Sequence, residues 1–232
     1  MSIHKLLQNL FARYGLFISR TPLKFYYDLE NEIKSNLILN SAGVLHIGAH
    51  YGQESEYYNE KQLNVIWIEA IPEAYNELRN KISKFAKQKA YCALVGNENL
   101  TNVDFFISNN NGSASSIFKI SKKADFKSVL MQAKLQLPMV RLDALLSNVD
   151  MTKYDHWIID VQGAELLVLE GAGYLISFCR SITIEVSTRE TYINGARYQH
   201  LKDYLFTQGF FPLWEPAKYD HTDIPFIRFR DS

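Results

Sequence analysis

The chain has 232 residues, and its 25 lysines and arginines are matched by 25 aspartates and glutamates, so its formal net charge at pH 7 is zero. This balance gives no overall positive field toward nucleic acid, and we predict no nucleic-acid partner. Hydrophobic residues make up 47% and charged residues 22%, as in ordinary globular proteins, and the length suits one α/β domain. The two cysteines, Cys92 and Cys179, lie in apolar runs, where we expect buried thiols of a reducing compartment rather than a disulfide or metal site.

The N-terminal stretch has an amphipathic pattern, with apolar residues at helical spacing from Ile3 to Phe17 and basic residues around them. We expect a helix near 4–16 that packs on the domain or on a partner subunit, with a helix lying on a membrane surface as the alternative. The stretch lacks a signal-peptide layout, and no apolar run approaches the roughly 20 residues of a membrane span. A cytoplasmic location is therefore expected, with peripheral contact at the inner membrane face left open.

Strand-like and helical segments alternate after Gly43, which predicts an α/β fold with a mainly parallel sheet and helices on both faces. The predicted strands lie near 43–48, 64–69, 89–95, 103–108, 138–142, 156–161, 180–187, 209–214 and 224–230. The predicted helices lie near 4–16, 22–36, 52–62, 72–87, 121–134, 163–176 and 196–207. The last two strands are expected to form an antiparallel pair at the sheet edge. We predict a helical N-terminal extension over 1–40 and the α/β domain over 41–232.

The first two predicted strands of the sheet end in residues suited to a ligand. The first stops at Gly48, and Gly52 follows before a helix expected to begin near Gln53. The second strand ends at Glu69, 21 residues after Gly48. Glycine lets the backbone approach a ligand closely, and an acid at the end of the second strand accepts hydrogen bonds from ribose hydroxyls. This pattern predicts a site for a ligand that contains an adenosine ribose.

The spacing of the two glycines narrows the identity of that ligand. A dinucleotide site needs three glycines in G-x-G-x-x-G, so that a pyrophosphate can bind at a helix N-terminus. Here His50 stands where the middle glycine would be, and no Lys-Ser/Thr pair follows, which excludes a P-loop. The loop suits a cofactor with a ribose and no phosphates, which indicates S-adenosylmethionine rather than NAD.

Two later strands carry carboxylates near their carboxyl ends. Asp160 ends the strand near 156–161, before a helix expected to begin near Ala164, and Glu185 lies late in the strand near 180–187. Ligands of open α/β sheets bind beyond the carboxyl ends of the strands, so both acids should face the crevice that contains Gly48. Glu165 is interpreted as a first-turn acid favoured by the helix dipole.

Each of these carboxylates also has a plainer interpretation. Asp160 or Gln162 would then cap the helix that follows, because acidic and amide side chains are preferred near helix N-termini. Glu185 would then form an ion pair with Arg180 or Arg189. The sequence leaves these alternatives open.

Five short segments share their content and order with one known family: HIGAHYGQ at 46–53, WIEAIP at 67–72, VRLDAL at 140–145, IDVQGAE at 159–165 and IEVS at 184–187. In these segments the chain resembles the FkbM-type methyltransferases, and the resemblance spans roughly 43–214. It implies a class I, Rossmann-like methyltransferase domain that uses S-adenosylmethionine. The usual acceptor in that family is a hydroxyl of a sugar or of a polyketide-like small molecule.

The resemblance also implies which residues form the site. The predicted cofactor contacts are His46, Gly48, His50, Gly52, Glu69, Ala70, Ala93 and Asp160. Two positions depart from the family pattern: His46 stands where many members carry an acid, and Gln162 replaces the usual Glu of the D-V-E-G-A-E motif. Loss of that Glu counts against a metal held by two carboxylates of the turn, and we predict no metal.

Methyl transfer to a hydroxyl needs a base within hydrogen-bond reach of the acceptor, and the candidate catalytic residues are Asp160, His50 and Glu185. Histidine titrates near neutrality, whereas an aspartate needs its pKa raised by burial. However, His50 lies in the cofactor loop, where packing or cofactor contact would explain it equally well, so Asp160 is preferred. The spacing pairs His221 with no carboxylate, and we expect it at the surface.

The acceptor is less well defined by the sequence. Tyr192, Tyr198 and the run 210–214 either shape an acceptor site or pack in the core, and the serines of the loop 109–116 either meet the acceptor or stay solvated. We expect an O-methyltransferase acting on a sugar, glycan or related small molecule. The alternatives are an NAD-linked or nucleotide-sugar enzyme and a non-catalytic partner subunit. A homo-oligomer is left open.

Overall fold

The computed structural model describes residues 23–124, 128–217 and 221–229. The helix predicted near 4–16, with its membrane or partner contact, lies outside these residues. The chain divides into two compact units, Met1–Asn36 and Leu37–Ser232. The helix predicted near 22–36 corresponds to α2, Leu23–Leu39. None of the helices in the described ranges combines the length and apolar character needed to cross a bilayer.

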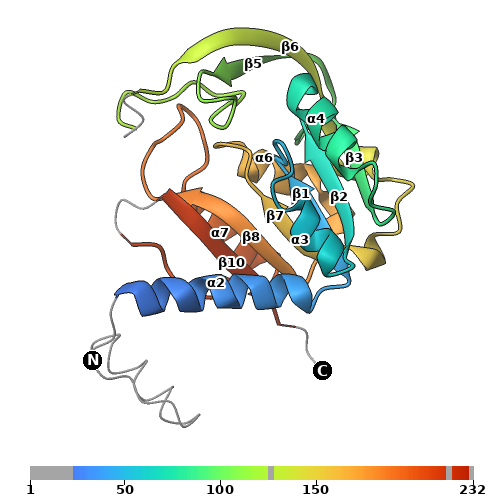
Figure 1. Cartoon of the computed structure of the whole chain (residues 1–232). Coiled ribbons are helices and arrows are strands. Elements are labelled where there is room, and N and C mark those ends of the chain that lie inside the picture. Colours follow the sequence, from blue (N-terminus) through green and yellow to red (C-terminus); the bar gives the residue numbers. More distant parts are fainter. Residues whose placement is uncertain (1–22, 125–127, 218–220, 230–232) are drawn as a thin grey trace, which may run out of the picture. The chain divides into compact units, whose positions relative to one another are not determined.

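A seven-stranded sheet organises the second unit, in the order β3-β2-β1-β7-β8-β10-β9 (Figure 1). The strands are β1 Gly43–Ile47, β2 Asn64–Glu69, β3 Gln88–Cys92, β7 His156–Ile159, β8 Ser181–Ser187, β9 Phe210–Pro212 and β10 His221–Arg228. From β3 to β8 neighbouring strands are parallel, whereas β10 is antiparallel to both β8 and β9. The predicted mainly parallel sheet with an antiparallel pair at its edge is confirmed, with β10 inserted between β8 and β9.

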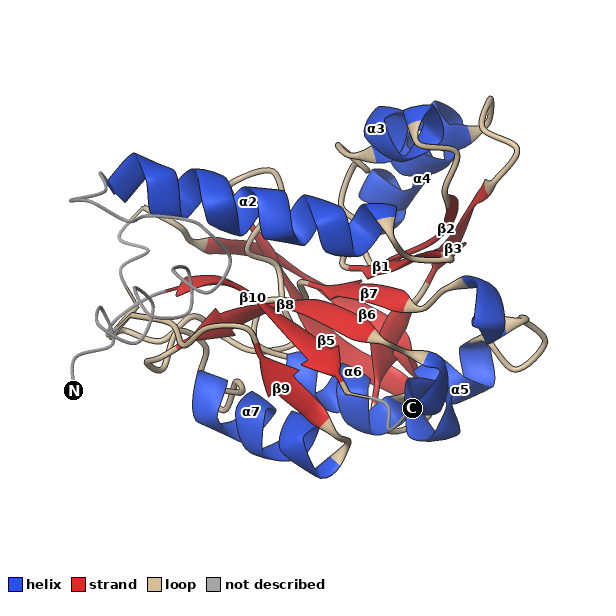
Figure 2. Ribbon diagram, turned by 90° about the horizontal axis from the view of Figure 1, so that it is seen from below, coloured by secondary structure: helices blue, strands red, loops and turns tan. Residues whose placement is uncertain are grey.

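Helices cover both faces of this sheet (Figure 2). One face carries α3 Ser55–Glu60 and α4 Pro72–Ile82, and the other carries α5 Leu142–Leu145, α6 Glu165–Gly171, the 3-10 helix Gly173–Phe178 and α7 Tyr198–Thr207. A further 3-10 helix, Met151–Lys153, precedes β7. Because side chains alternate across a strand, Val44 packs with α3 and α4, whereas Leu45 joins the cluster on the opposite face. Four of the predicted helices, near 52–62, 72–87, 163–176 and 196–207, are confirmed with shorter bounds.

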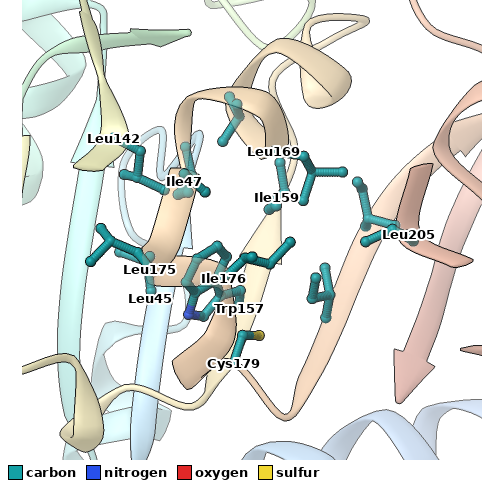
Figure 3. Close-up of a cluster of buried hydrophobic side chains, with 14 of the residues drawn as sticks. Leu45, Ile47, Leu142, Trp157, Ile159, Leu169, Leu175, Ile176, Cys179 and Leu205 are labelled. Atoms are coloured by element: carbon teal, nitrogen blue, oxygen red, sulfur yellow. The ribbon is translucent and has the colours of Figure 1, made fainter. Parts of the chain in front are cut away.

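The larger hydrophobic cluster gathers around Trp157 (Figure 3). Trp157 is completely buried, and its indole N–H donates to the Tyr154 carbonyl at 3.0 Å, so its polar atom is satisfied inside the core. Leu45 and Ile159 are also fully buried, and burial of each such side chain stabilises the fold by about 1.5–3 kcal/mol. The cluster fixes the spacing of β1, β7 and β8, whose carboxyl ends carry the polar residues of the site.

A second sheet of three strands, in the order β4-β6-β5, arches over one end of the first (Figure 1). It consists of β4 Leu94–Gly96, β5 Leu100–Ser108 and β6 Met131–Arg141. The helix predicted near 121–134 is wrong over its described residues, because 121–124 and 128–130 form no helix and 131–134 begin β6. Gln132, Ala133 and Lys134 favour helix by intrinsic propensity, but antiparallel pairing with β5 outweighs this preference, and Leu135, Leu137 and Met139 then alternate along one face.

The strand predicted near 89–95 is interrupted, and the chain passes from the large sheet to the small one at Ala93. Its N–H donates to the Glu69 carbonyl at 2.9 Å, which holds the crossing point beside the end of β2. Both cysteines are free thiols, as expected, but Cys92 at the end of β3 is exposed, in contrast to the prediction that both would be buried. A thiol at the last residue of a strand escapes the core that encloses Cys179.

Gly171, at the end of α6, is where that helix approaches the second sheet. A Cβ at this position would lie 1.8 Å from the Gly96 carbonyl oxygen, which belongs to the backbone of β4. We expect Gly171→Ala to lower the free energy of unfolding by about 1–3 kcal/mol, because the helix must move away from the sheet.

Gly209→Ala is the matched control in urea denaturation. The nearest atoms to its Cβ, in Arg228, are 3.9 Å away, and the cost there is that of a left-handed backbone, about 1 kcal/mol. Equal losses in the two variants would contradict the close packing of α6 on β4.

Candidate active site

A cavity of about 250 Å³ lies at the carboxyl ends of the central strands. Its wall is formed by the ends of β1, β2 and β7, by the crossing point after β3, and by the loop 109–116 that follows β5. The predicted cofactor residues that line it are His46, Gly48, His50, Glu69, Ala70, Ala93 and Asp160. The structure thus brings these seven residues to one place, at the edge of the sheet where the sequence predicts a ligand.

The turn after β1 needs glycine at position 48 for a steric reason. Gly48 has φ +83°, and a Cβ there would lie 1.7 Å from the carbonyl oxygen of Asp160. The N–H groups of Gly48 and Ala49 both donate to the Ile68 carbonyl, at 2.9 and 3.1 Å. The turn is therefore fixed between the ends of β2 and β7, with its backbone on the cavity wall.

Gly52 lies behind the cavity wall rather than on it. Its φ is +60°, and a Cβ at this position would be 2.4 Å from the Cδ1 atom of Leu78 in α4. Its carbonyl accepts a hydrogen bond from Lys81 Nζ at 2.8 Å. Gly52 packs between the loop and α4 and does not line the cavity, and its contact with the cofactor stays a prediction.

Glu69 is buried at the end of β2, with both carboxylate oxygens held by backbone N–H groups. Oε2 accepts from the N–H of His50 at 2.6 Å, and Oε1 accepts from that of Ile71 at 2.8 Å. Burial raises the pKa of Glu69, and these two bonds oppose the rise because they favour the ionised form. Each oxygen has a second lone pair, so the carboxylate can still accept hydrogen bonds from a ligand in the cavity.

The His50 ring connects the loop after β1 to the loop after β5. Its Nε2 lies 2.8 Å from the carbonyl oxygen of Asn111, which can only accept, so Nε2 carries a proton. Its Nδ1 lies 3.3 Å from Gln53 Nε2, an amide donor. Both ring nitrogens of the neutral imidazole are thus engaged, which disfavours His50 as the base. The backbone φ of +47° shows that this position is constrained to a turn.

His46 forms a neutral polar part of the cavity wall. Its ring stacks on Trp67 with centroids 4.9 Å apart, and its Nδ1 lies 3.5 Å from the hydroxyl of Tyr58. Burial is the main cause of its lowered pKa, because water is excluded from the charged form. The strands β1 and β7 are neighbours, and the His46 ring packs on Trp67 of β2.

One amide group joins two carboxylates at the ends of β7 and β8. The Nε2 of Gln162 donates to Asp160 Oδ1 at 2.5 Å and to Glu185 Oε2 at 2.6 Å. The Tyr192 hydroxyl donates to the Oε1 atom of Gln162 at 2.6 Å, which fixes the orientation of the amide. Both amide hydrogens are therefore directed at carboxylate oxygens, and these bonds partly compensate the two acids for lying close together.

Asp160 is the member of this pair that lines the cavity, whereas Glu185 lies behind it. Burial raises the pKa of Asp160 well above its ordinary value, and the negative charge of Glu185 adds to the effect. A carboxylate with a raised pKa is a more effective proton acceptor near neutral pH. The geometry favours Asp160 over Glu185 as the base because only Asp160 lines the cavity, and Glu185 contacts Asp160 both directly and through Gln162.

Glu165 organises the turn between β7 and α6 from inside the protein. It is buried, and its Oε1 accepts from the N–H groups of Gly163 at 2.9 Å and Val161 at 3.2 Å. The N-cap residue of α6 is Ala164, and no side chain caps the helix, so the capping alternative for Asp160 and Gln162 is wrong. Burial raises the pKa of Glu165 to about 7, with a further contribution from the charge of Glu185.

The oxygens of Asp160, Glu165 and Glu185 lie within 4.8 Å of one another. Within this acidic group, backbone N–H groups donate hydrogen bonds to Glu165, and the Gln162 amide donates to the other two carboxylates. These donors supply the compensation that a cation would otherwise provide. The absence of a metal stays a prediction.

His221 is a site residue that the sequence interpretation missed. It is exposed, as expected, but its Nε2 lies 2.9 Å from Glu185 Oε1, a carboxylate partner that the spacing in the sequence did not reveal. In the antiparallel register His221 lies opposite Ser187, which makes Glu185 its diagonal neighbour on the same face. This pairing depends on the register of β10 against β8, and no local pattern reveals it. Arg180, the alternative partner for Glu185, pairs with Asp155 at 3.4 Å.

The acceptor candidates separate into cavity, framework and core residues. Ser113 and Ser115 both line the cavity, but Ser113 is exposed, whereas Ser115 and Ser116 are buried. The Oγ of Ser115 accepts the N–H of Ser108 at 3.0 Å, so this hydroxyl shapes the loop. Tyr192 contacts the site through Gln162, and Tyr198 belongs to the core.

The buried Glu165 predicts a specific pH dependence of stability. Its pKa is about 7 in the folded protein and 4.5 when unperturbed, so the folded state binds the proton more tightly. Stability from this group is greatest below the unperturbed value and falls as pH rises to about 7, by about 3 kcal/mol in total. Glu165→Gln keeps the acceptor oxygen and removes the titration, so its stability relative to wild type should increase between pH 4.5 and 7.

Urea denaturation at several pH values tests this expectation. Glu77→Gln, at an exposed position of α4, is the control and should leave the difference from wild type independent of pH. A constant difference between wild type and Glu165→Gln would contradict the assigned burial.

Comparisons with known proteins give three results. Similar solved structures include magnesium protoporphyrin IX methyltransferase from Synechocystis PCC 6803 with bound SAM, at 10% identity and a TM-score of 0.44, covering 99% of this chain and 98% of that chain. They also include Aeropyrum pernix fibrillarin in complex with S-adenosyl-L-methionine, at 11% identity and a TM-score of 0.47, covering 82% of this chain and 68% of that chain. A search of curated proteins finds no match.

The third result is a match of residues 46–212 to the model of the methyltransferase FkbM domain. The matched range includes all five segments on which the resemblance rests, together with Gly48, Glu69 and Asp160. Because the match extends over more than half of the sequence, the chain belongs to the FkbM methyltransferase family.

Proposed function

We propose that this protein is an S-adenosylmethionine-dependent methyltransferase that methylates a hydroxyl of a sugar, glycan or related small molecule. The main support for the proposal is the cavity. An acid suited to bind ribose hydroxyls lies on one side of the turn after β1, and a candidate base lies on the other. Glu69 ends β2, Asp160 follows β7, and both strands flank β1. The membership of the FkbM methyltransferase family supports the same reaction class.

The residues of the cavity fit the cofactor. Glu69 would accept hydrogen bonds from the ribose hydroxyls through the lone pairs that the backbone leaves available. Ile71, Leu94 and Phe105 form an apolar part of the wall, which suits the faces of an adenine ring. When bound, S-adenosylmethionine supplies an electrophilic methyl group on a sulfonium.

Asp160 would accept the proton of the acceptor hydroxyl, which makes the oxygen a better nucleophile. Its raised pKa suits this task, and the Gln162 amide holds the carboxylate in place. The second sheet and the loop 109–116 cover the cavity and keep the reacting groups in a fixed orientation, which is a large part of the catalysis of a displacement reaction. The base assignments of His50 and Glu185 are less favoured by their contacts.

A small acceptor fits the remaining features. The hydroxyl of Ser113 lies on the cavity wall, and the sequence has no net charge that would draw it to nucleic acid. The two free thiols agree with the proposed cytoplasmic location. Contact through the N-terminal helix and a homo-oligomer stay predictions.

Calorimetric titration tests the cofactor. We expect S-adenosylmethionine to bind with micromolar affinity, and Glu69→Ala to weaken binding by about 100-fold, because charge-assisted bonds to two hydroxyls are lost. Glu73→Gln, at an exposed position of α4, should bind as wild type does. Binding of NAD in place of S-adenosylmethionine would move the assignment to the NAD-linked alternative, and binding of neither would favour the non-catalytic subunit.

Turnover tests the base. With methyl-labelled S-adenosylmethionine and a panel of methyl glycosides, Asp160→Asn should reduce methyl transfer by about 10²- to 10⁴-fold, the range of a lost general base. Cofactor affinity should stay close to that of wild type, because Glu69 is intact. Full activity of Asp160→Asn would show that another group accepts the proton.

A further inference from the structure

A continuous line of side-chain contacts leads from the cavity to His221, the first residue of β10. Asp160 faces the cavity, and Gln162 Nε2 bridges it to Glu185 at 2.5 and 2.6 Å. The other oxygen of Glu185 contacts His221 Nε2 at 2.9 Å. The exposed fraction of the side chain rises from 15% at Glu185 to 33% at His221, so the histidine end of the line reaches solvent.

His221 faces an acidic surrounding. The carboxylates whose negative charge acts on it include Glu185 from β8, Glu165 from α6 and Asp223 from its own strand, with Asp160 after β7 beyond Glu185. The hydrogen bond with Glu185 is the main cause of the raised pKa of His221, and burial opposes it. The imidazolium is therefore favoured over the neutral ring, and it places one positive charge beside the carboxylate pair.

That charge matters for the pair because two neighbouring acids do not ionise independently. The first proton leaves easily, and the second leaves at higher pH because the remaining charges repel. A cation in contact with one carboxylate stabilises the doubly ionised form, in which Asp160 is free to accept a proton.

We propose that His221 is a positioning residue for Asp160, whose imidazolium offsets the negative charge of Glu185 and thereby keeps Asp160 available as the base that faces the cavity. The inference rests on the proposed function for the role of Asp160. It assigns to His221 no contact with substrate or cofactor, since His221 acts through Glu185 and lies outside the cavity wall.

The test is a pH titration of the carboxyl pair in the full chain. It is monitored by NMR of protein that is labelled with ¹³C at the aspartate and glutamate carboxyl carbons. Spectra of Asp160→Asn and Glu185→Gln assign the two signals. In His221→Gln, which loses the charge, the upper titration step of the pair should move to higher pH by about 1 unit, the lower end of the effect of a neighbouring charge. In His221→Lys, which restores a positive charge, the step should return toward its wild-type position.

His200→Gln is the matched control, because His200 is exposed on α7, where its Nδ1 accepts from the N–H of Arg197. It should leave both steps unchanged. A structural role alone would move the step equally in His221→Gln and His221→Lys, and that result would overturn the inference. An unchanged upper step in His221→Gln would overturn it as well.

Calorimetry with S-adenosylmethionine on the same samples separates this inference from the proposed function. Wild type and His221→Gln should bind the cofactor equally, since Glu69 is untouched. Failure of both to bind would remove the proposed function and, with it, the catalytic meaning of the coupling, even if the carboxyl titration behaves as expected.

Discussion

The contact between the turn after β1 and the end of β7 controls the geometry of the whole site. At Gly48 the backbone approaches the Asp160 carbonyl so closely that no Cβ fits between them. The amide of Asp160 in turn donates to the Ile47 carbonyl at 3.0 Å, so the two strand ends hold each other at a fixed separation. This approach opens the cavity between Glu69 on one side and Asp160 on the other.

Around that contact, the protein places several acids close together and compensates them with neutral donors. Backbone N–H groups donate hydrogen bonds to Glu69 and Glu165, and the side-chain amide of Gln162 donates to Asp160 and Glu185. A buried carboxylate without such donors would be strongly destabilising, because water no longer solvates its charge. Hydrogen bonds satisfy the oxygens yet leave the pKa of Asp160 raised, and this combination suits a group that must gain and lose a proton.

The family pattern gives the turn after β7 a second acid where this chain has Gln162, and the structure shows what the amide accomplishes. A glutamate at this position would add a further negative charge to Asp160, Glu165 and Glu185. The amide instead donates to two of these carboxylates, and Tyr192 fixes its orientation. Glutamine in place of glutamate therefore makes the turn less negative, and its amide still joins the turn to both carboxylates by hydrogen bonds.

Much of the framework can be predicted from local pattern. The parallel strands appear as apolar runs, the turn at Gly48 follows from its position after a strand, and Glu69 and Asp160 follow from the rule that ligands bind at strand ends. The segment 121–134 departs from what its local pattern predicts. Its composition favours helix, and the β5 pairing that makes its end a strand involves residues more than twenty positions away.

The sequence by itself determined the order of the elements, the family and the acids at the strand ends, because these depend on periodicity and on short motifs. The tertiary structure decided which of these residues share a site. Gly52 packs against α4 and lies outside the cavity wall, and both ring nitrogens of His50 have hydrogen-bond partners. The register of β10 places His221 beside Glu185. The physical reason is that contacts between distant segments follow from the packing of strands and loops, and no single stretch of sequence contains that information.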